Sequence, residues 1–350
     1  MTAIAPPGRF WLSVLIPMFK VEAYLDQCLA SIIGQADAGV EILICDDCSP
    51  DGSGAIALRY VAAFPQQVRL IRHAHNRGIS AARNSLIAGA RGEYVWFVDS
   101  DDWLRPGAIA TVAAVVRSHH PDMIGCDYSK QGLRRSGFCG PGGRVLTNRD
   151  QFVGGICASR KMYAWLRIVR RDLWPGGLRF PEGRVYEDAA IIPRLALAVR
   201  RYFHINRSLV VYRVRPGSIL AGVKNARRPF DMAAHCDLAE AFQGFPEMLE
   251  REAEPFVRTR FGASHFIATE FAKTAARIRR TGAGGDDRVG EKVLIGQFRV
   301  MMERSSPIPF APLARRYLRG GRVLAWLRLR RALAWGAAAP VTPPAPRSRS

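Results

Sequence analysis

The 350-residue chain is long enough for one large domain or two smaller ones, and its 48% of hydrophobic and 23% of charged residues are ordinary for a globular protein. A net charge of +21, from 51 basic and 30 acidic residues, favours polyanionic partners such as phosphates, nucleic acid or an anionic membrane surface without choosing among them. No apolar run approaches the roughly 18 residues of a transmembrane helix, so we expect no membrane-spanning segment.

The N-terminus and the cysteines indicate a compartment. Residues 1–8 are mainly small residues and prolines, without the charged segment and long apolar run of a secretory signal. The seven cysteines are an odd number and do not suggest a disulfide framework. We therefore expect a cytoplasmic protein with reduced thiols. Cys45 and Cys48 form a C-x-x-C pair, but no second pair lies near enough to complete a zinc site.

Strands and helices alternate over the first hundred residues. Residues 11–17 and 40–45 are short, β-rich apolar runs, and the apolar residues between them recur with a helical period. A helix over 53–64, a strand over 68–72, a helix over 80–90 capped by Ser80, and a strand over 94–98 follow. This pattern predicts a mostly parallel sheet with helices on both faces and ligands at the carboxyl ends of the strands.

The later chain is divided by composition. The alternating pattern extends over a first part at 11–125, and a second part spans 126–220 and includes a Gly-rich, mobile loop over 132–143. Residues 221–335 are mainly helical in character, and 336–350 form a Pro- and Ser-rich disordered tail. From residue 305 onward the chain contains nine Arg and no acidic residue.

Asp99-Ser100-Asp101-Asp102 directly follows the apolar strand at 94–98. Side chains at i and i+2 of an extended segment point the same way, so Asp99 and Asp101 share one side at the edge of the sheet. Two carboxylates in this position suit Mg²⁺ or Mn²⁺. The alternative is a solvated turn that caps the next helix.

Asp46-Asp47 ends a neighbouring strand, so two acidic strand ends are expected on one rim. Acidic pairs after strands also serve as simple turn formers, and that alternative stays open. Further along, Gly78 leads into a helix, which favours an anion site where Arg83 reaches the same phosphate. The alternative is an ordinary capped helix with Arg83 in solvent. His73 and His75 alternate on one strand and are expected to be strand-end residues.

Together these residues resemble the family 2 glycosyltransferases, which have the GT-A fold. The matching elements are Val14-Leu15-Ile16-Pro17, Glu22 with Tyr24-Leu25, Ser31 and Gln35, Asp46-Asp47 with Ser49 and Asp51-Gly52, Asn76 with Gly78 and Ala82-Arg83-Asn84, Gly92-Glu93-Tyr94, and Asp99-Ser100-Asp101-Asp102. They occur in the family's order over residues 11–105. A weaker match continues through Trp165, Arg170-Arg171, Phe180, Glu187-Asp188 and Tyr212-Arg213.

The resemblance implies a GT-A type α/β fold, with a mostly parallel nucleotide-binding sheet flanked by helices, an acceptor-side half and a helical C-terminal extension. It implies an inverting transfer of a sugar from a nucleotide diphosphate sugar to the hydroxyl of a glycan or lipid-linked glycan, in surface polysaccharide assembly. The expected donor contacts are Pro17, Phe19, Glu22, Asp46, Asp47, Arg83, Asp99 and Ser100. Asp101 and Asp99 would hold Mn²⁺ or Mg²⁺. Asp188 would be the general base, unless Glu187 and Asp188 cap the next helix.

Three positions depart from the family's pattern. Phe19 and Lys20 stand where Tyr and Asn are common, which removes a hydroxyl and an amide from the nucleotide side. Cys48 stands where Gly is usual, so the turn after the acidic pair lacks glycine's freedom at positive φ. These changes bear on which nucleotide base is selected more than on catalysis.

Other classes of protein fit less well. A nucleotidyltransferase acting on sugar phosphates would carry a glycine-rich basic loop after the first strand, and a dinucleotide-binding oxidoreductase would carry G-x-G-x-x-G. A non-catalytic nucleic-acid-binding protein would show a basic stripe interleaved with aromatic residues, so no nucleic acid is expected. Attachment to the inner face of an anionic membrane through the Arg-rich segment 315–335 remains open. Against it, Leu324 and Leu327 lie among the arginines and Gly320-Gly321 interrupts the helical pattern.

Overall fold

A computed structural model of the chain divides into two compact units, Met1–Arg215 and Pro216–Ser350. It describes residues 10–174, 177–215, 232–281 and 288–336. The boundary expected between residues 220 and 221, and residues 337–350 of the expected tail, lie outside these ranges. Among the described helices, none combines the length and apolar character needed to cross a bilayer.

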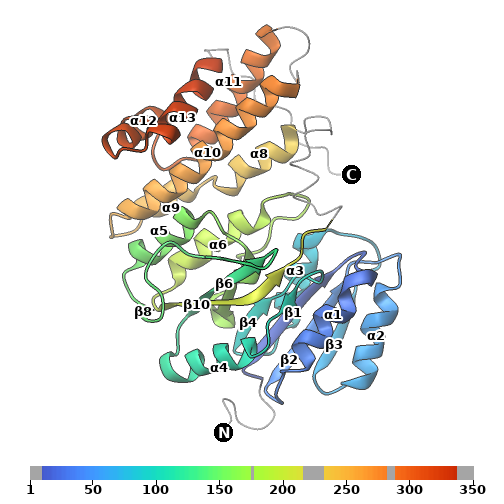
Figure 1. Cartoon of the computed structure of the whole chain (residues 1–350). Coiled ribbons are helices and arrows are strands. Elements are labelled where there is room, and N and C mark those ends of the chain that lie inside the picture. Colours follow the sequence, from blue (N-terminus) through green and yellow to red (C-terminus); the bar gives the residue numbers. More distant parts are fainter. Residues whose placement is uncertain (1–9, 175–176, 216–231, 282–287, 337–350) are drawn as a thin grey trace. The chain divides into compact units, whose positions relative to one another are not determined.

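The first unit is built around one sheet. Its strands are β1 (Leu12–Met18), β2 (Val40–Asp46), β3 (Val68–Arg72), β4 (Tyr94–Phe97), β5 (Trp103–Leu104), β6 (Met123–Lys130), β7 (Leu133–Arg135), β8 (Val145–Leu146), β9 (Arg167–Arg170) and β10 (Tyr202–Tyr212). In the described part of the chain the order is β3-β2-β1-β4-β9-β6-β10-β5, with β7 on β6 and β8 on β10 (Figure 1). Strands β1 to β4 are parallel, whereas β9 lies antiparallel between β4 and β6. The predicted α/β class with a mostly parallel sheet is confirmed.

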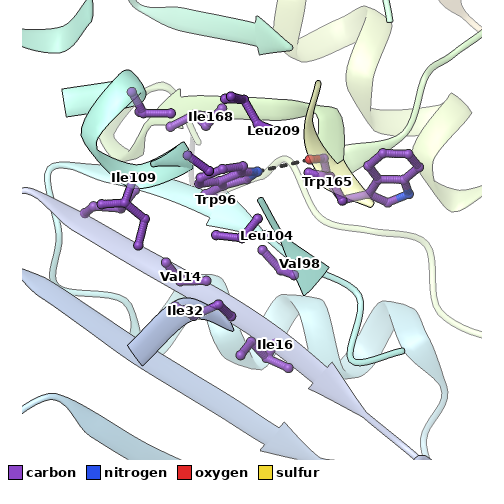
Figure 2. Packing of buried hydrophobic residues seen from close by; sticks show 14 of the residues in the cluster. Val14, Ile16, Ile32, Trp96, Val98, Leu104, Ile109, Trp165, Ile168 and Leu209 are labelled. Atoms are coloured by element: carbon purple, nitrogen blue, oxygen red, sulfur yellow. Dashed lines mark hydrogen bonds between the residues drawn. The ribbon is translucent and has the colours of Figure 1, made fainter. Parts of the chain in front are cut away.

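Helices pack on both faces of this sheet. They are α1 (Glu22–Ile33), α2 (Ser53–Ala63), α3 (Ile79–Gly89), α4 (Ala108–His119), α5 (Arg149–Ser159) and α6 (Glu187–Ala198), with short 3-10 turns η1 (Ala164–Leu166) and η2 (Arg171–Leu173). On one face Val14 of β1 packs with Ile32 of α1, Trp96 of β4 and Ile109 of α4 (Figure 2). On the other, a Cβ on Gly89 would lie only 3.0 Å from Leu43 Cδ2, so α3 approaches β2 closely.

Trp96 joins the parallel half of the sheet to the second half. Its indole is fully buried, and its Nε1 donates to the carbonyl oxygen of Trp165 in η1 over 3.0 Å (Figure 2). A buried Trp contributes a large apolar area and needs a partner for its N–H. The bond therefore fixes η1, and the chain that follows it, against β4.

Part of the Gly-rich stretch at 132–143 was wrongly expected to be a mobile loop. Residues 133–135 form β7 as a hairpin with β6. The Gly137 N–H donates to the buried Asp127 carboxylate over 3.0 Å, and Phe138 is buried. The glycines allow the turn at Gln131 and Gly132, both at positive φ, but ladder bonds and burial then hold the segment.

The second unit is helical in its described residues. Its helices are α8 (Met232–Ala241), α9 (Phe245–Glu250), α10 (Val257–Thr281), α11 (Arg288–Arg304), α12 (Phe310–Arg319) and α13 (Val323–Trp335). The long α10 packs against α11, α12 and α13. Phe271 of α10 lies with its ring centroid 5.1 Å from Phe310 and 6.1 Å from Phe298, which gives this unit an aromatic core of its own.

Candidate functional site

The carboxyl ends of three parallel strands meet at one edge of the sheet. Met18 of β1 pairs with Asp46 of β2, and Leu15 pairs with Phe97 of β4. The segments that follow these strands carry the residues singled out in the sequence. Ligands bind at this edge in open parallel sheets, because successive connections leave it in different directions.

Three aspartates lie together after β4. One carboxylate oxygen from each of Asp99, Asp101 and Asp102 lies within 4.8 Å of the other two. Asp99 and Asp101 were expected from the sequence, and Asp102 joins them. Its Oδ1 accepts from the Arg213 N–H over 2.7 Å, and its buried Oδ2 has no hydrogen-bond partner within the described residues. Burial and the neighbouring negative charge of Asp99 raise the pKa of Asp102 to about 9.

The segment that follows β10 brings two arginines to this cluster. Arg213 Nε donates to the Asp101 carbonyl oxygen over 2.8 Å, and the Arg213 guanidinium lies 4.6 Å from the centre of the Trp103 ring. Arg215 Nε contacts Asp101 Oδ2. Arg213 was expected within a motif, whereas Arg215 was missed, because nothing in the local pattern reports a partner over a hundred residues away.

Arg83 is the centre of the site. Its side chain is only 3% exposed and lies over the rings of Phe97 and Phe180, at 5.7 and 5.3 Å. Nη1 donates to Glu187 Oε1 over 2.8 Å and to Asp188 Oδ1 over 2.7 Å, and Nη2 lies 3.3 Å from Asp99 Oδ1. The alternative of an Arg83 in solvent is wrong. Its guanidinium joins the acidic cluster to the Glu187-Asp188 pair, and its contact with a phosphate stays a prediction.

Asp188 lies in the first turn of α6, close to the cluster. Its Oδ2 accepts from the Ala164 N–H over 3.2 Å, and its side chain remains 15% exposed. Burial raises the pKa of Asp188 to about 7, with a further rise from Glu187 and Asp99, although Arg83 acts against it. A carboxyl with such a pKa can accept a proton near neutral pH.

The capping alternative for the Glu187-Asp188 pair is wrong. The residue before the helix is Tyr186, at φ 64° and ψ 25°, and it makes no side-chain cap. A non-glycine residue in this left-handed region is strained. Tyr186 directly precedes Glu187 and Asp188, the two residues that Arg83 binds. Backbone strain of this kind is often found at functional sites.

The donor-side residues lie at the ends of β1 and β2. Pro17 is buried in β1, Ser100 is buried after β4, and Phe19 is 38% exposed. Glu22 Oε2 accepts from the Gly52 N–H over 2.9 Å and so joins the loops after β1 and β2. Cys48 has a φ of 59°, so it adopts the left-handed conformation without being glycine.

Asp46 and Asp47 are both buried and both hold loops. Asp46 Oδ1 accepts from the Ser49 N–H over 2.9 Å. Asp47 accepts from the N–H groups of Arg77 and Gly78 over 2.9 and 2.7 Å. Both carboxylates therefore hold the loops at this edge of the sheet, as turn formers do. A direct contact of either carboxylate with a ligand remains a prediction.

The start of α3 differs from the expected serine cap. Gly78, at φ 86°, precedes the helix, and Ser80 is buried with no hydrogen-bond partner for its hydroxyl within the described residues. The two histidines lie beyond the end of β3 at Arg72, so they do not alternate on a strand. His73 contacts Asp47, whereas His75 is exposed.

Part of the chain matches a known protein family. Residues 13–135 match the family model described as glycosyl transferase family 2. The chain is 31% identical over 216 residues to the uncharacterized glycosyltransferase EpsJ of Bacillus subtilis strain 168, a match that covers 59% of this chain and 62% of EpsJ. The chain thus matches less than two thirds of that relative's length.

Solved structures share the fold. The S. aureus TarS 1-349 structure in complex with UDP-GlcNAc has a TM-score of 0.67 at 19% identity, covering 93% of this chain and 92% of the TarS 1-349 chain. The mannosyltransferase PcManGT from Pyrobaculum calidifontis, in complex with GDP-Man and Mn²⁺, has a TM-score of 0.53 at 16% identity, covering 94% and 87%. At these identities the likeness shows the GT-A type fold.

Proposed function

We propose that the chain is a family 2 glycosyltransferase, which transfers a sugar from a nucleotide diphosphate sugar to an acceptor hydroxyl with inversion at the anomeric carbon. One observation carries the proposal beyond the similarity to this family. Arg83 joins Asp99, at the expected donor and metal position, to Asp188, at the expected position of the base. Both halves of a displacement reaction therefore have their groups at one edge of the sheet. The nucleotidyltransferase alternative gains no support from the comparisons.

The acidic cluster fits a divalent cation. Asp99, Asp101 and Asp102 are hard oxygen donors, and the buried Oδ2 of Asp102 is without a partner among the described residues. When bound, Mn²⁺ or Mg²⁺ would neutralise charge on the leaving diphosphate. PcManGT was solved in complex with GDP-Man and Mn²⁺, and TarS in complex with UDP-GlcNAc, which supports a metal and a nucleotide sugar here.

Asp188 supplies the base in the proposed reaction. Its carboxylate accepts the proton of the acceptor hydroxyl, the freed oxygen forms a bond to the anomeric carbon, and the bond to the nucleoside diphosphate breaks from the opposite side. An α-linked donor would give a β-linked product. Arg83 orients Asp188, because one oxygen of that carboxylate is fixed by the guanidinium and the other by the Ala164 N–H.

The donor lies, in this proposal, along the rim formed after β1, β2 and β4. Phe19 offers an exposed ring and Glu22 an exposed carboxylate there, with Pro17 behind them. Asp46 and Asp47 hold the surrounding loops, and Asp99 and Ser100 approach the sugar and ribose. Arg83, predicted as a phosphate contact, is assigned instead to positioning the carboxylates that it binds.

The acceptor is proposed to be a glycan or a lipid-linked glycan, and a surface of the second unit suits an anionic membrane. Leu318, Val323, Leu324 and Leu327 are 52, 48, 70 and 48% exposed. The same segment carries exposed arginines at 315, 316, 319, 322, 328, 330 and 331. We call α12, α13 and their connection the α12–α13 surface. Leucines exposed among arginines can enter the headgroup region while the guanidinium groups meet lipid phosphates.

Calorimetric titration tests the donor site. We expect at least one of UDP, GDP and dTDP to bind in the presence of Mn²⁺, and binding to be lost in Asp101→Ala. The matched control is Asp26→Ala, which removes an exposed aspartate whose carboxylate binds Arg59 and Tyr60 of α2. If no nucleotide binds with Mn²⁺ or Mg²⁺, the proposed donor site is wrong.

A further inference from the structure

A buried histidine–aspartate pair, His73 with Asp47, has no part in the proposed chemistry. His73 Nδ1 lies 2.7 Å from Asp47 Oδ1, and the two side chains are 7 and 3% exposed. His73 Nε2 lies 2.9 Å from Ser85 Oγ on α3. Because a carboxylate only accepts, Nδ1 carries the proton in this contact, and Nε2 lies within hydrogen-bond distance of the Ser85 hydroxyl.

Asp47 fixes the loop that starts α3. Its Oδ1 also accepts from the Arg77 N–H, and its Oδ2 accepts from the Gly78 N–H. The Asn76 side chain donates to the Asp47 carbonyl oxygen over 3.3 Å. The Asp47 carboxylate therefore holds residues 77 and 78, its carbonyl oxygen holds Asn76, and the helix that follows carries Arg83.

His73 determines how that carboxylate is turned. The two backbone N–H groups reach different oxygens, so both bonds form only when the Asp47 carboxylate has one rotation about its χ2 bond. His73 Nδ1 is the third donor to this carboxylate and the second at Oδ1, and Ser85 holds the ring in turn. This contact restricts the rotation of the carboxylate. Without it the terminal torsion of an aspartate is broad.

We propose that His73 is a positioning residue for the donor site, acting through Asp47 on the loop at 76–78. This inference rests on the proposed function, because it takes the rim at the carboxyl ends of β1 and β2 to be where the nucleotide binds. It assigns to His73 an effect on donor affinity and no part in the proton transfer, which takes place at Asp188.

Two substitutions separate the two nitrogens of the ring. In His73→Asn the side-chain amide nitrogen stands near the place of Nδ1 and can still donate to Asp47. In His73→Gln the amide reaches the place of Nε2, so it keeps the Ser85 side and loses Asp47. Loss of a hydrogen bond to a charged group predicts a KM for the donor about tenfold or more higher in His73→Gln. We expect kcat to stay within about twofold, and both constants of His73→Asn to stay near wild type.

Amide hydrogen exchange gives a readout that needs no donor. The N–H groups of Arg77 and Gly78 should exchange faster in His73→Gln than in wild type, and at the wild-type rate in His73→Asn. Thermal melting of both variants checks that they are folded. Equal behaviour of the two variants, or a fall in kcat at unchanged KM, would overturn the inference. If the wild type binds no nucleotide, the proposed function fails, while the exchange measurement still decides whether His73 holds the loop.

Discussion

Asp188 combines burial with proximity to two other carboxylates. Ionising it in this setting is costly, and burial first of all raises its pKa to about 7. A general base must be deprotonated to act, so a raised pKa removes activity on the acidic side. We expect kcat to be level at alkaline pH and to fall about tenfold per unit below pH ~7. Rates measured between about pH 5 and 9 with Mn²⁺ would show this limb.

The variant Asp188→Asn tests the same role, because it keeps the shape of the side chain and removes the group that accepts the proton. We expect kcat to fall by about 10²- to 10⁴-fold, as for other removed general bases, with nucleotide binding retained. Asp26→Asn, on the exposed surface of α1, serves as the control and should keep wild-type rates. A rate that is flat with pH in the wild type, or an active Asp188→Asn, would remove Asp188 from the mechanism.

Arg83 compensates three buried or half-buried carboxylates. Arg83→Met would leave Asp99, Glu187 and Asp188 close together without their cation. Breaking a buried ion pair from one side costs about 3–5 kcal/mol of unfolding free energy, because the remaining charges stay desolvated. Urea unfolding measures this cost.

A surface arginine provides the control for that measurement. Arg59 is 64% exposed and its partner Asp26 is 59% exposed, so Arg59→Met should cost less than about 1 kcal/mol. If the two variants were equally stable, Arg83 would not be the group that holds the cluster to α6.

At the scale of elements, the turn between α3 and β4 requires a glycine at position 92. A Cβ on Gly92 would lie 2.5 Å from the Ser13 nitrogen and 2.7 Å from the Leu12 carbonyl carbon, both backbone atoms of β1. The Gly92 N–H also donates to Ser13 Oγ over 2.7 Å. Gly92→Ala would therefore push β4 away from β1 and cost about 1–3 kcal/mol of unfolding free energy.

Gly177 is the matched control, because a Cβ there would meet no atom of the described residues, its chain neighbours aside, within 4 Å. Gly177→Ala should leave the free energy of unfolding in urea unchanged within about 0.5 kcal/mol. A Gly92→Ala protein as stable as the Gly177→Ala protein would show that the sheet can give way at this turn.

The elements of the first hundred residues were predictable because each carries its own signal. Strands β1 to β4 are apolar runs, and α1 buries the stripe of Leu25, Cys28, Leu29 and Ile32. Strand β9 was not predicted, since Arg167–Arg170 places two apolar residues between two arginines and its position between β4 and β6 depends on tertiary pairing.

The same limit applies to the site. Asp99, Asp101 and Asp188 could be chosen from local patterns, but the contact of Arg83 with Asp188 joins residues 105 positions apart. No helical or strand period reports such a pair. His73 was set aside for the same reason, because its partners Asp47 and Ser85 lie on two other segments.

At the scale of the whole molecule, the charge of +21 gives the membrane proposal a test. We expect the full chain to co-sediment with phosphatidylglycerol vesicles, to stay in solution with phosphatidylcholine vesicles, and to lose binding as salt rises. The double variant Leu324→Glu with Leu327→Glu should bind weakly, because it places negative charge on the α12–α13 surface.

A leucine of the first unit is the control for this experiment. Leu58 of α2 is 48% exposed, as Leu327 is, so Leu58→Glu makes the same kind of change elsewhere. Binding that is lost equally in both proteins would reflect net charge alone. Binding that is retained in the double variant would exclude the α12–α13 surface as the contact.

The central claim is that one edge of the sheet holds both the donor-side metal cluster and the base, joined by Arg83. Its sharpest test is nucleotide release from a panel of UDP-, GDP- and dTDP-sugars with Mn²⁺ or Mg²⁺, measured for the wild type, Asp101→Ala and Asp188→Asn. We expect metal-dependent release from a selected donor by the wild type and almost none by either variant. Release by Asp101→Ala or Asp188→Asn at the wild-type rate would contradict the claim.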